Sequence, residues 1–173
     1  MKNVMKLVLA AAFVLGGTTV MAQQIKLGYV NSQELFAAMP ERDSAFVKLE
    51  AYATELQDQL DLIRVELNTK FQDYQKNMST YTDGVRNMRE SEIQSISTRL
   101  QESQQMAEEE IQRAQGELLT PVFDKLNAAI EKVSKDNGLT AVFDVAAGAM
   151  IYHDTNTMVD MLPLVKRELG IAN

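Results

Sequence analysis

The sequence has no cysteine and no tryptophan, and its 173 residues include only one histidine and three prolines. Without cysteine the chain forms no disulfide, so its fold must be held together by packing alone. Glutamine, glutamate, leucine and alanine are abundant, which is typical of a helix-rich protein with a modest core.

Basic residues are the scarcer charged class, with 17 Lys and Arg against 24 Asp and Glu. Lys2 and Lys6 belong to an N-terminal segment that we expect to be removed, which leaves 15 against 24 and a net charge of −9. Phosphate contacts need clustered cations, so an acidic chain binds nucleic acid poorly. We therefore expect no nucleic-acid partner.

Residues that carry chemistry are equally scarce. His153 is followed by Asp154, but adjacent residues of a strand point to opposite faces, and without cysteine the histidine cannot complete a zinc site. The acidic run 108–110 consists of consecutive helical residues that point in different directions, which is typical of a solvated surface. The sequence also lacks a glycine-rich phosphate loop. We expect no catalytic residue, no metal site, no cofactor and no enzymatic activity.

Residues 1–22 are typical of a secretory signal peptide. Lys2 and Lys6 precede a short apolar run over residues 7–14, and Val20-Met21-Ala22 is a small-residue cleavage site. A transmembrane anchor is the alternative, but the apolar run is too short for it, and no other segment is long and apolar enough to span a bilayer. We expect export and cleavage near Ala22.

The middle of the chain, residues 41–119, is predicted to be helical throughout. Leu49, Leu56 and Ile63 interleave with a second apolar row that recurs every seven residues, as in a coiled coil (Phe46, Ala53, Leu60, Leu67, Tyr74 and Tyr81). A second, less regular seam runs from Ile93 to Leu118. The best turn signal is 82–84, near the midpoint, which predicts an antiparallel hairpin. The alternative is one continuous rod with Gly84 inside it, at a cost of about 1 kcal/mol.

The flanking segments, 23–40 and 120–173, are predicted to form one small α+β body. Strands are expected near Tyr29, over 139–145 and over 149–153, the last two as a hairpin around Gly148. Helices are expected over 33–39, over 122–136 after a break at Pro121, and over 157–169. So small a sheet has exposed edges, which favours pairing between copies. The candidates for this contact are Leu27, Tyr29, Val30, Val142, Phe143 and Ile151.

The predicted tip of the hairpin combines apolar and basic side chains. The apolar candidates for partner binding are Met78, Tyr81, Val85 and Met88, and methionine adapts to varied partners. The basic candidates are Lys76, Arg86 and Arg89. Residues 70–89 carry a net charge of +2, whereas 41–66 carry −4 and 90–117 carry −5. The alternative is that the apolar residues simply close the end of the coiled coil.

Several segments follow one another in a characteristic order: residues 28–33 (Gly-Tyr-Val-Asn-Ser-Gln), 39–41 (Met-Pro-Glu), the helical middle, 138–144, 148–152, 158–160 and 169–171. Together they resemble the Skp/OmpH family of periplasmic chaperones. The resemblance covers the whole chain after the signal peptide. It implies a homotrimer in which the small bodies form a trimerisation domain and three helical arms surround a cavity. It also implies that unfolded outer-membrane β-barrel proteins are held there without ATP.

One property departs from the family pattern, because its best-known members are strongly basic and this chain is acidic. Charge-based contacts with lipopolysaccharide are therefore not carried over, and weak contact of the basic tip with anionic lipids is the most that we expect. A structural coiled-coil spacer or adaptor of the cell envelope remains the alternative function. That alternative predicts rigid arms and one fixed partner.

Overall fold

The computed structural model describes residues 25–171. The predicted signal peptide and its cleavage site lie outside these residues. The described elements are β1 (Leu27–Val30), α2 (Ser32–Ala38), α3 (Pro40–Asn77), α4 (Asp83–Asp136), β2 (Ala141–Asp144), β3 (Val159–Asp160) and α5 (Leu162–Glu168). The prediction of a mainly helical fold with a small sheet is confirmed.

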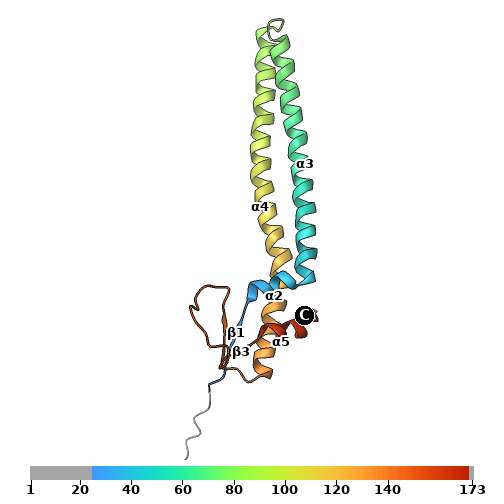
Figure 1. Cartoon of the computed structure of the whole chain (residues 1–173). Helices are drawn as coiled ribbons and strands as arrows, with labels where there is room; N and C mark the ends of the chain where they lie inside the picture. Colours follow the sequence, from blue (N-terminus) through green and yellow to red (C-terminus); the bar gives the residue numbers. More distant parts are fainter. Residues whose placement is uncertain (1–24, 172–173) are drawn as a thin grey trace, which may run out of the picture.

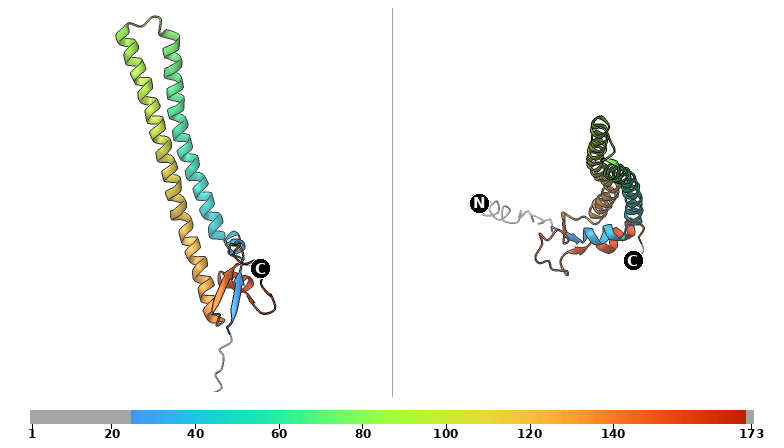
Figure 2. Two further views of the ribbon diagram at one scale, coloured as in Figure 1. Left: turned by 90° about the vertical axis from the view of Figure 1, so that its left-hand side faces the viewer. Right: turned by 90° about the horizontal axis from the view of Figure 1, so that it is seen from above.

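The molecule consists of a small body and two long helices that extend from it side by side (Figure 1). α3 leaves the body, the chain turns at residues 78–82, and α4 returns along α3 (Figure 2). We call this pair of helices the arm and its far end, residues 74–89, the tip. The 38 residues of α3 correspond to roughly 57 Å at 1.5 Å per residue.

The body contains a three-stranded sheet in the order β2-β1-β3, with both outer strands parallel to β1. The strands near Tyr29 and over 139–145 are thus confirmed. The predicted strand over 149–153 is wrong, because that segment belongs to a long connection and the third strand is Val159–Asp160. A parallel third strand needs a crossover rather than a tight hairpin, and the residues after Gly148 provide that length.

The helices of the body also differ in part from the prediction. α2 is capped by the Asn31 side chain, which accepts a hydrogen bond from the Glu34 amide, and it ends before Pro40 as expected. The final helix is shorter than predicted, since residues 159–160 join the sheet and α5 begins only at Leu162.

The predicted break at Pro121 is wrong, because α4 runs through it without interruption. A proline inside a helix costs one backbone hydrogen bond and some steric strain. Burial on both sides of the proline offsets that cost, since Leu119, Val122 and Leu126 all lie in the core of the body. α4 therefore belongs to both parts of the molecule and connects them as one continuous helix.

The core lies where the last third of α4 meets β1, α2 and α5. Its fully buried side chains are Leu35, Met39, Met161 and Val165. We call the end of the arm next to the body, residues 40–46 and 118–123, the root. There the rings of Phe36 in α2 and Phe123 in α4 stack with centroids 4.4 Å apart, which connects α2 to α4. The arm has far less core, because each of its helices covers only one side of the other. Between the root and the tip only Leu60, Ile96 and Ala107 are buried.

Candidate functional site

The tip is ordered by local contacts. The Thr82 side chain accepts a hydrogen bond from the Val85 amide and so caps the start of α4. The rings of Tyr74 and Tyr81 lie 6.3 Å apart in a tilted arrangement, and the Tyr81 hydroxyl donates to Asp73. Tyr81 and Val85 are half-buried, so they close the end of the seam between the two helices.

Two methionines of the tip remain exposed. Met78 at the end of α3 and Met88 in the first turns of α4 each expose about half of their surface. The predicted apolar residues of the tip therefore divide into two kinds. Tyr81 and Val85 stabilise the turn, while Met78 and Met88 are available to a partner.

The cations of the tip are largely paired. Arg89 bonds Glu92 at 2.8 Å, and Arg86 lies 3.6 Å from Asp83. Lys70, which precedes the tip, bonds the same Glu92 carboxylate at 2.5 Å. The hydrogen bonds from Lys70 and Arg89 lower the pKa of Glu92 below its ordinary value. Lys76 has no ion pair among residues 25–171. Among the three predicted basic residues of the tip, Lys76 is therefore the one whose charge is not balanced by an ion pair within residues 25–171.

The arm is held together by a thin apolar seam. Leu56, Leu60 and Ile63 of α3 face Met106 and Ala107 of α4 across a shallow groove of about 140 Å³. Leu56 and Ile63 are only half-buried, and Met106 is exposed. Apolar surface is thus open to solvent along the arm, and a two-helix arrangement cannot cover it.

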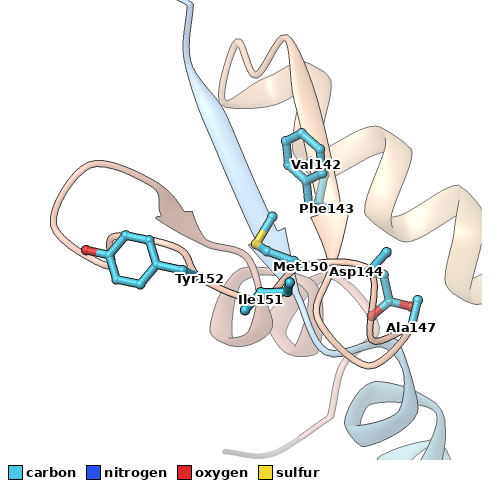
Figure 3. A pocket seen from close by; sticks show the side chains of 8 residues that line it. Val142, Phe143, Asp144, Ala147, Met150, Ile151 and Tyr152 are labelled. Atoms are coloured by element: carbon cyan, nitrogen blue, oxygen red, sulfur yellow. The ribbon is translucent and has the colours of Figure 1, made fainter.

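The body carries a second apolar surface, formed by β2 and the connection after it (Figure 3). An open hollow of about 640 Å³ is lined by Val142, Phe143, Asp144, Ala147, Ala149, Met150, Ile151 and Tyr152. Ile151 is 101% exposed and Tyr152 is 80% exposed. Large apolar side chains this exposed are typical of a surface that meets a partner.

The six candidates for self-association do not all lie on this surface. Phe143 and Ile151 are exposed there, and Val142 lines the hollow while also packing against the core. Leu27 and Tyr29 are half-buried in the central strand. Val30 is only 3% exposed and belongs to the core of its own protomer. Met150 and Tyr152 also line the hollow and were not among the predicted candidates.

Asp144, at the end of β2, organises the edge of this hollow. Its carboxylate accepts hydrogen bonds from the Ser32 hydroxyl at 2.5 Å, the Ser32 amide at 3.1 Å and the Ala146 amide at 3.0 Å. Burial by itself raises the pKa of this carboxyl group, but the bonds from Ser32 and Ala146 outweigh it and leave the pKa below its ordinary value. Asp144 therefore connects the sheet to the start of α2.

His153, the one histidine of the sequence, lies against the Tyr29 ring, with centroids 4.3 Å apart. Residues 25–171 contain no group of three or more His, Cys, Asp or Glu side chains placed to hold a metal ion. Over the same range, no helix has both the length and the apolar character needed to cross a membrane.

The structure defines a protein in which a small α+β body carries a long two-helix arm with exposed apolar side chains. The comparisons with known proteins give the family. A family model described as outer membrane protein (OmpH-like) matches residues 26–169. The chain belongs to this OmpH-like family, which includes the Skp chaperones.

Several relatives have the name "Chaperone protein Skp". The one from Pectobacterium atrosepticum is 25% identical over 141 residues, which cover 82% of this chain and 86% of the relative. The one from Photorhabdus laumondii is 26% identical over 141 residues, with the same coverage. The relatives are thus named as chaperones and not as enzymes.

The fold agrees with this relationship. The crystal structure of an OmpH-like protein from Caulobacter crescentus CB15 superimposes with a TM-score of 0.72 and 14% sequence identity, over 84% of this chain and 83% of the other. The fold of this chain is therefore OmpH-like.

Proposed function

We propose that this protein is a periplasmic chaperone that holds unfolded outer-membrane β-barrel proteins and prevents their aggregation without ATP. The observation that carries the proposal is the incompletely covered seam of the arm, where only Leu60, Ile96 and Ala107 are buried between root and tip. The names of the relatives support the same conclusion. A long surface of weak apolar contacts suits clients that have no fixed shape.

Self-association belongs to this proposal. Three copies joined through the hollow around Phe143, Ile151 and Tyr152 bury the most exposed apolar side chains of the body. In such a trimer one client can contact all three arms. Once one arm has bound it, the effective concentration of the other two arms around the client is high, so many weak contacts add up to stable binding.

The tip supplies the first contact with the client. Lys76 is the cation there without an ion pair among the described residues, and the exposed Met78 and Met88 lie on the same end of the arm. Exposed charges act mainly on the rate of encounter and are screened over about 8–10 Å at moderate salt. The same combination supports weak contact with anionic lipid headgroups.

The deciding experiment measures the aggregation of an unfolded client. A urea-denatured outer-membrane β-barrel protein is diluted into buffer with and without the purified mature protein, and light scattering is followed. We expect the protein to suppress scattering at near-stoichiometric concentration, equally with and without ATP. A structural spacer or adaptor, the competing function, leaves the scattering unchanged.

A further inference from the structure

The two flanks of the arm differ in chemistry. The contacts between the helices define the flanks, because Tyr52 donates to Glu110 at 3.0 Å, Arg99 pairs with Glu66, and Lys70 bonds Glu92 at 2.5 Å. Tyr52 and Glu66 are fourteen residues apart, so they lie in one row on the same side of the apolar seam of α3. We call this side the ionic flank and the opposite side the amide flank.

On α4 the ionic flank is formed by a row of residues spaced alternately four and three apart, which lie on one side of the helix. Its row contains Ser95, Arg99, Glu102, Met106, Glu109 and Arg113, of which four are charged. Arg113 pairs with Glu110, and the hydrogen bond from Arg113 lowers the pKa of the Glu110 carboxyl group, with a further contribution from Tyr52. Both arginines of this row are thus paired within the arm, and Glu109 accepts a hydrogen bond from Gln105 at 2.9 Å.

The row on the other side of the same helix has one charge in six residues. It contains Ser97, Gln101, Gln104, Glu108, Ile111 and Gln115. Gln101 and Gln115 are exposed, while Ser97, Gln104 and Ile111 are half-buried beside the seam. The two rows of α4 therefore differ in charge, with four charged residues in six on the ionic flank and one in six on the amide flank.

α3 continues the amide flank toward the tip. Asp61 and Arg64 lie on it and pair with each other at 2.7 Å, which leaves no net charge there. Beyond them the row consists of Asn68, Phe71 and Gln75, and Phe71 exposes about half of its surface. The flank therefore offers amide groups beside the open edge of an apolar seam.

We propose that the amide flank is the surface of the arm that binds the client, and that its occupant is an uncharged, extended segment of an unfolded β-barrel protein. This rests on the proposed chaperone function. A carboxamide both donates and accepts hydrogen bonds, as a peptide group does, so it can bond an unpaired backbone without a matching charge. Burying a charged side chain under an apolar segment costs far more than burying a bonded amide.

The charge of the occupant matches this surface. Strands of outer-membrane barrels alternate apolar and polar residues and carry few charges on the lipid-facing side. Such a segment can place its apolar side chains against Phe71 and the seam, while its backbone bonds the glutamines. On the ionic flank the same segment has to displace the pairs of Glu66 and Arg99 and of Lys70 and Glu92.

The test adds negative charge to one flank at a time. Q75E/Q101E changes two exposed residues of the amide flank, and Q59E/Q72E makes the same change on the ionic flank and on the outer surface of α3. All four are exposed glutamines in helices, so both variants alter charge equally and preserve side-chain shape. Circular dichroism and sedimentation are used to check that both variants keep the helix content and the assembly of the wild type.

Affinity is measured for a urea-diluted outer-membrane β-barrel protein by fluorescence titration at moderate salt. We expect the Kd of Q75E/Q101E to rise about tenfold and that of Q59E/Q72E to stay within about twofold of the wild type. In addition, a photo-crosslinking amino acid at position 101 should capture the client, while the same group at position 59 should not.

The outcomes separate the two proposals. If the wild type does not bind the unfolded protein, the chaperone function is wrong and the flank assignment falls with it. If the wild type binds but both variants weaken binding equally, or position 59 crosslinks as well as position 101, the chaperone function stands and the assignment to the amide flank is overturned.

Discussion

Gly28 lies in the central strand, where there is no room for a side chain. A Cβ atom placed on it meets Leu139 Cδ1 at 2.8 Å, Met161 Cγ at 3.2 Å and Val142 Cγ2 at 3.4 Å. The end of the Leu139 side chain can move away from an added Cβ atom in part, but Met161 is fully buried and has little room to move. The glycine therefore permits β1 to lie closely against the elements on either side of it.

We expect Gly28→Ala to lower the free energy of unfolding by about 1–3 kcal/mol, the usual cost of overpacking a core. Gly84→Ala is the control, because nothing lies within 4 Å of its Cβ position in the first turn of α4. That change should be neutral or stabilising by up to about 1 kcal/mol. Urea unfolding followed by circular dichroism measures both, and equal effects would contradict this view of Gly28.

Asp144 predicts a dependence of stability on pH. Its pKa is lower in the folded protein than the ordinary value of 3.8, so its bonds to Ser32 and Ala146 stabilise the fold above that value. The contribution disappears as the pH falls through the folded pKa. An asparagine at this position cannot accept all three hydrogen bonds and does not titrate.

Asp144→Asn should therefore be less stable than the wild type near pH 6, and the difference should shrink below about pH 4. Thermal unfolding between pH 6 and pH 3 measures it. Two parallel stability curves over that range would show that the carboxylate contributes nothing specific to its ionised form.

At the scale of the elements, the arm depends on very few buried side chains. Leu60 is 8% exposed and lies in the seam, whereas Leu62, two residues further along α3, is 71% exposed. We expect Leu60→Ala to cost about 2–5 kcal/mol in the free energy of unfolding if the arm and body unfold together. Leu62→Ala should change it by less than about 0.5 kcal/mol.

Amide hydrogen exchange locates the effect of Leu60→Ala. Protection should be lost first along the middle of α3 and α4 and be retained in the body, where the core is concentrated. If the body loses protection to the same extent, the arm does not open independently.

At the scale of the whole molecule, the exposed surface of the body predicts its assembly. Ile151→Asp places a charge where the protomer buries nothing, since Ile151 is 101% exposed, so the fold of the single chain should be retained. In the proposed trimer the same charge is desolvated without a partner. Val142→Asp is a poorer test, because Val142 also packs against the core.

Sedimentation measures this prediction. The wild type should sediment as a trimer at micromolar concentration and Ile151→Asp as a monomer with unchanged helix content. Chaperone activity should fall with the assembly, because single arms lose the gain in effective concentration. A wild type that sediments as a monomer would overturn the proposed trimer.

The sequence by itself determined the elements whose signals are local. The seven-residue apolar repeat predicted the long helices, the Asn31 cap and Pro40 delimited α2, and the segments around 28–33 and 138–144 indicated the family. The structure also has α3 ending at Asn77 and α4 beginning at Asp83, close to the turn signal at 82–84. Periodicity and capping act over a few residues, so they can be read without knowing the fold.

Only the tertiary structure decided the rest. α4 continues through Pro121 because Leu119, Val122 and Leu126 pack in the core of the body. Residues 159–160 form the third strand because they pair with the edge of β1 opposite β2. Contacts between the elements also decide that Val30 lies in the core and that Tyr152 lies on the surface. The two flanks of the arm also became distinct only once Tyr52, Glu66 and Lys70 met their partners on α4. Each of these depends on contacts between residues far apart in sequence, and local propensity carries no information about them.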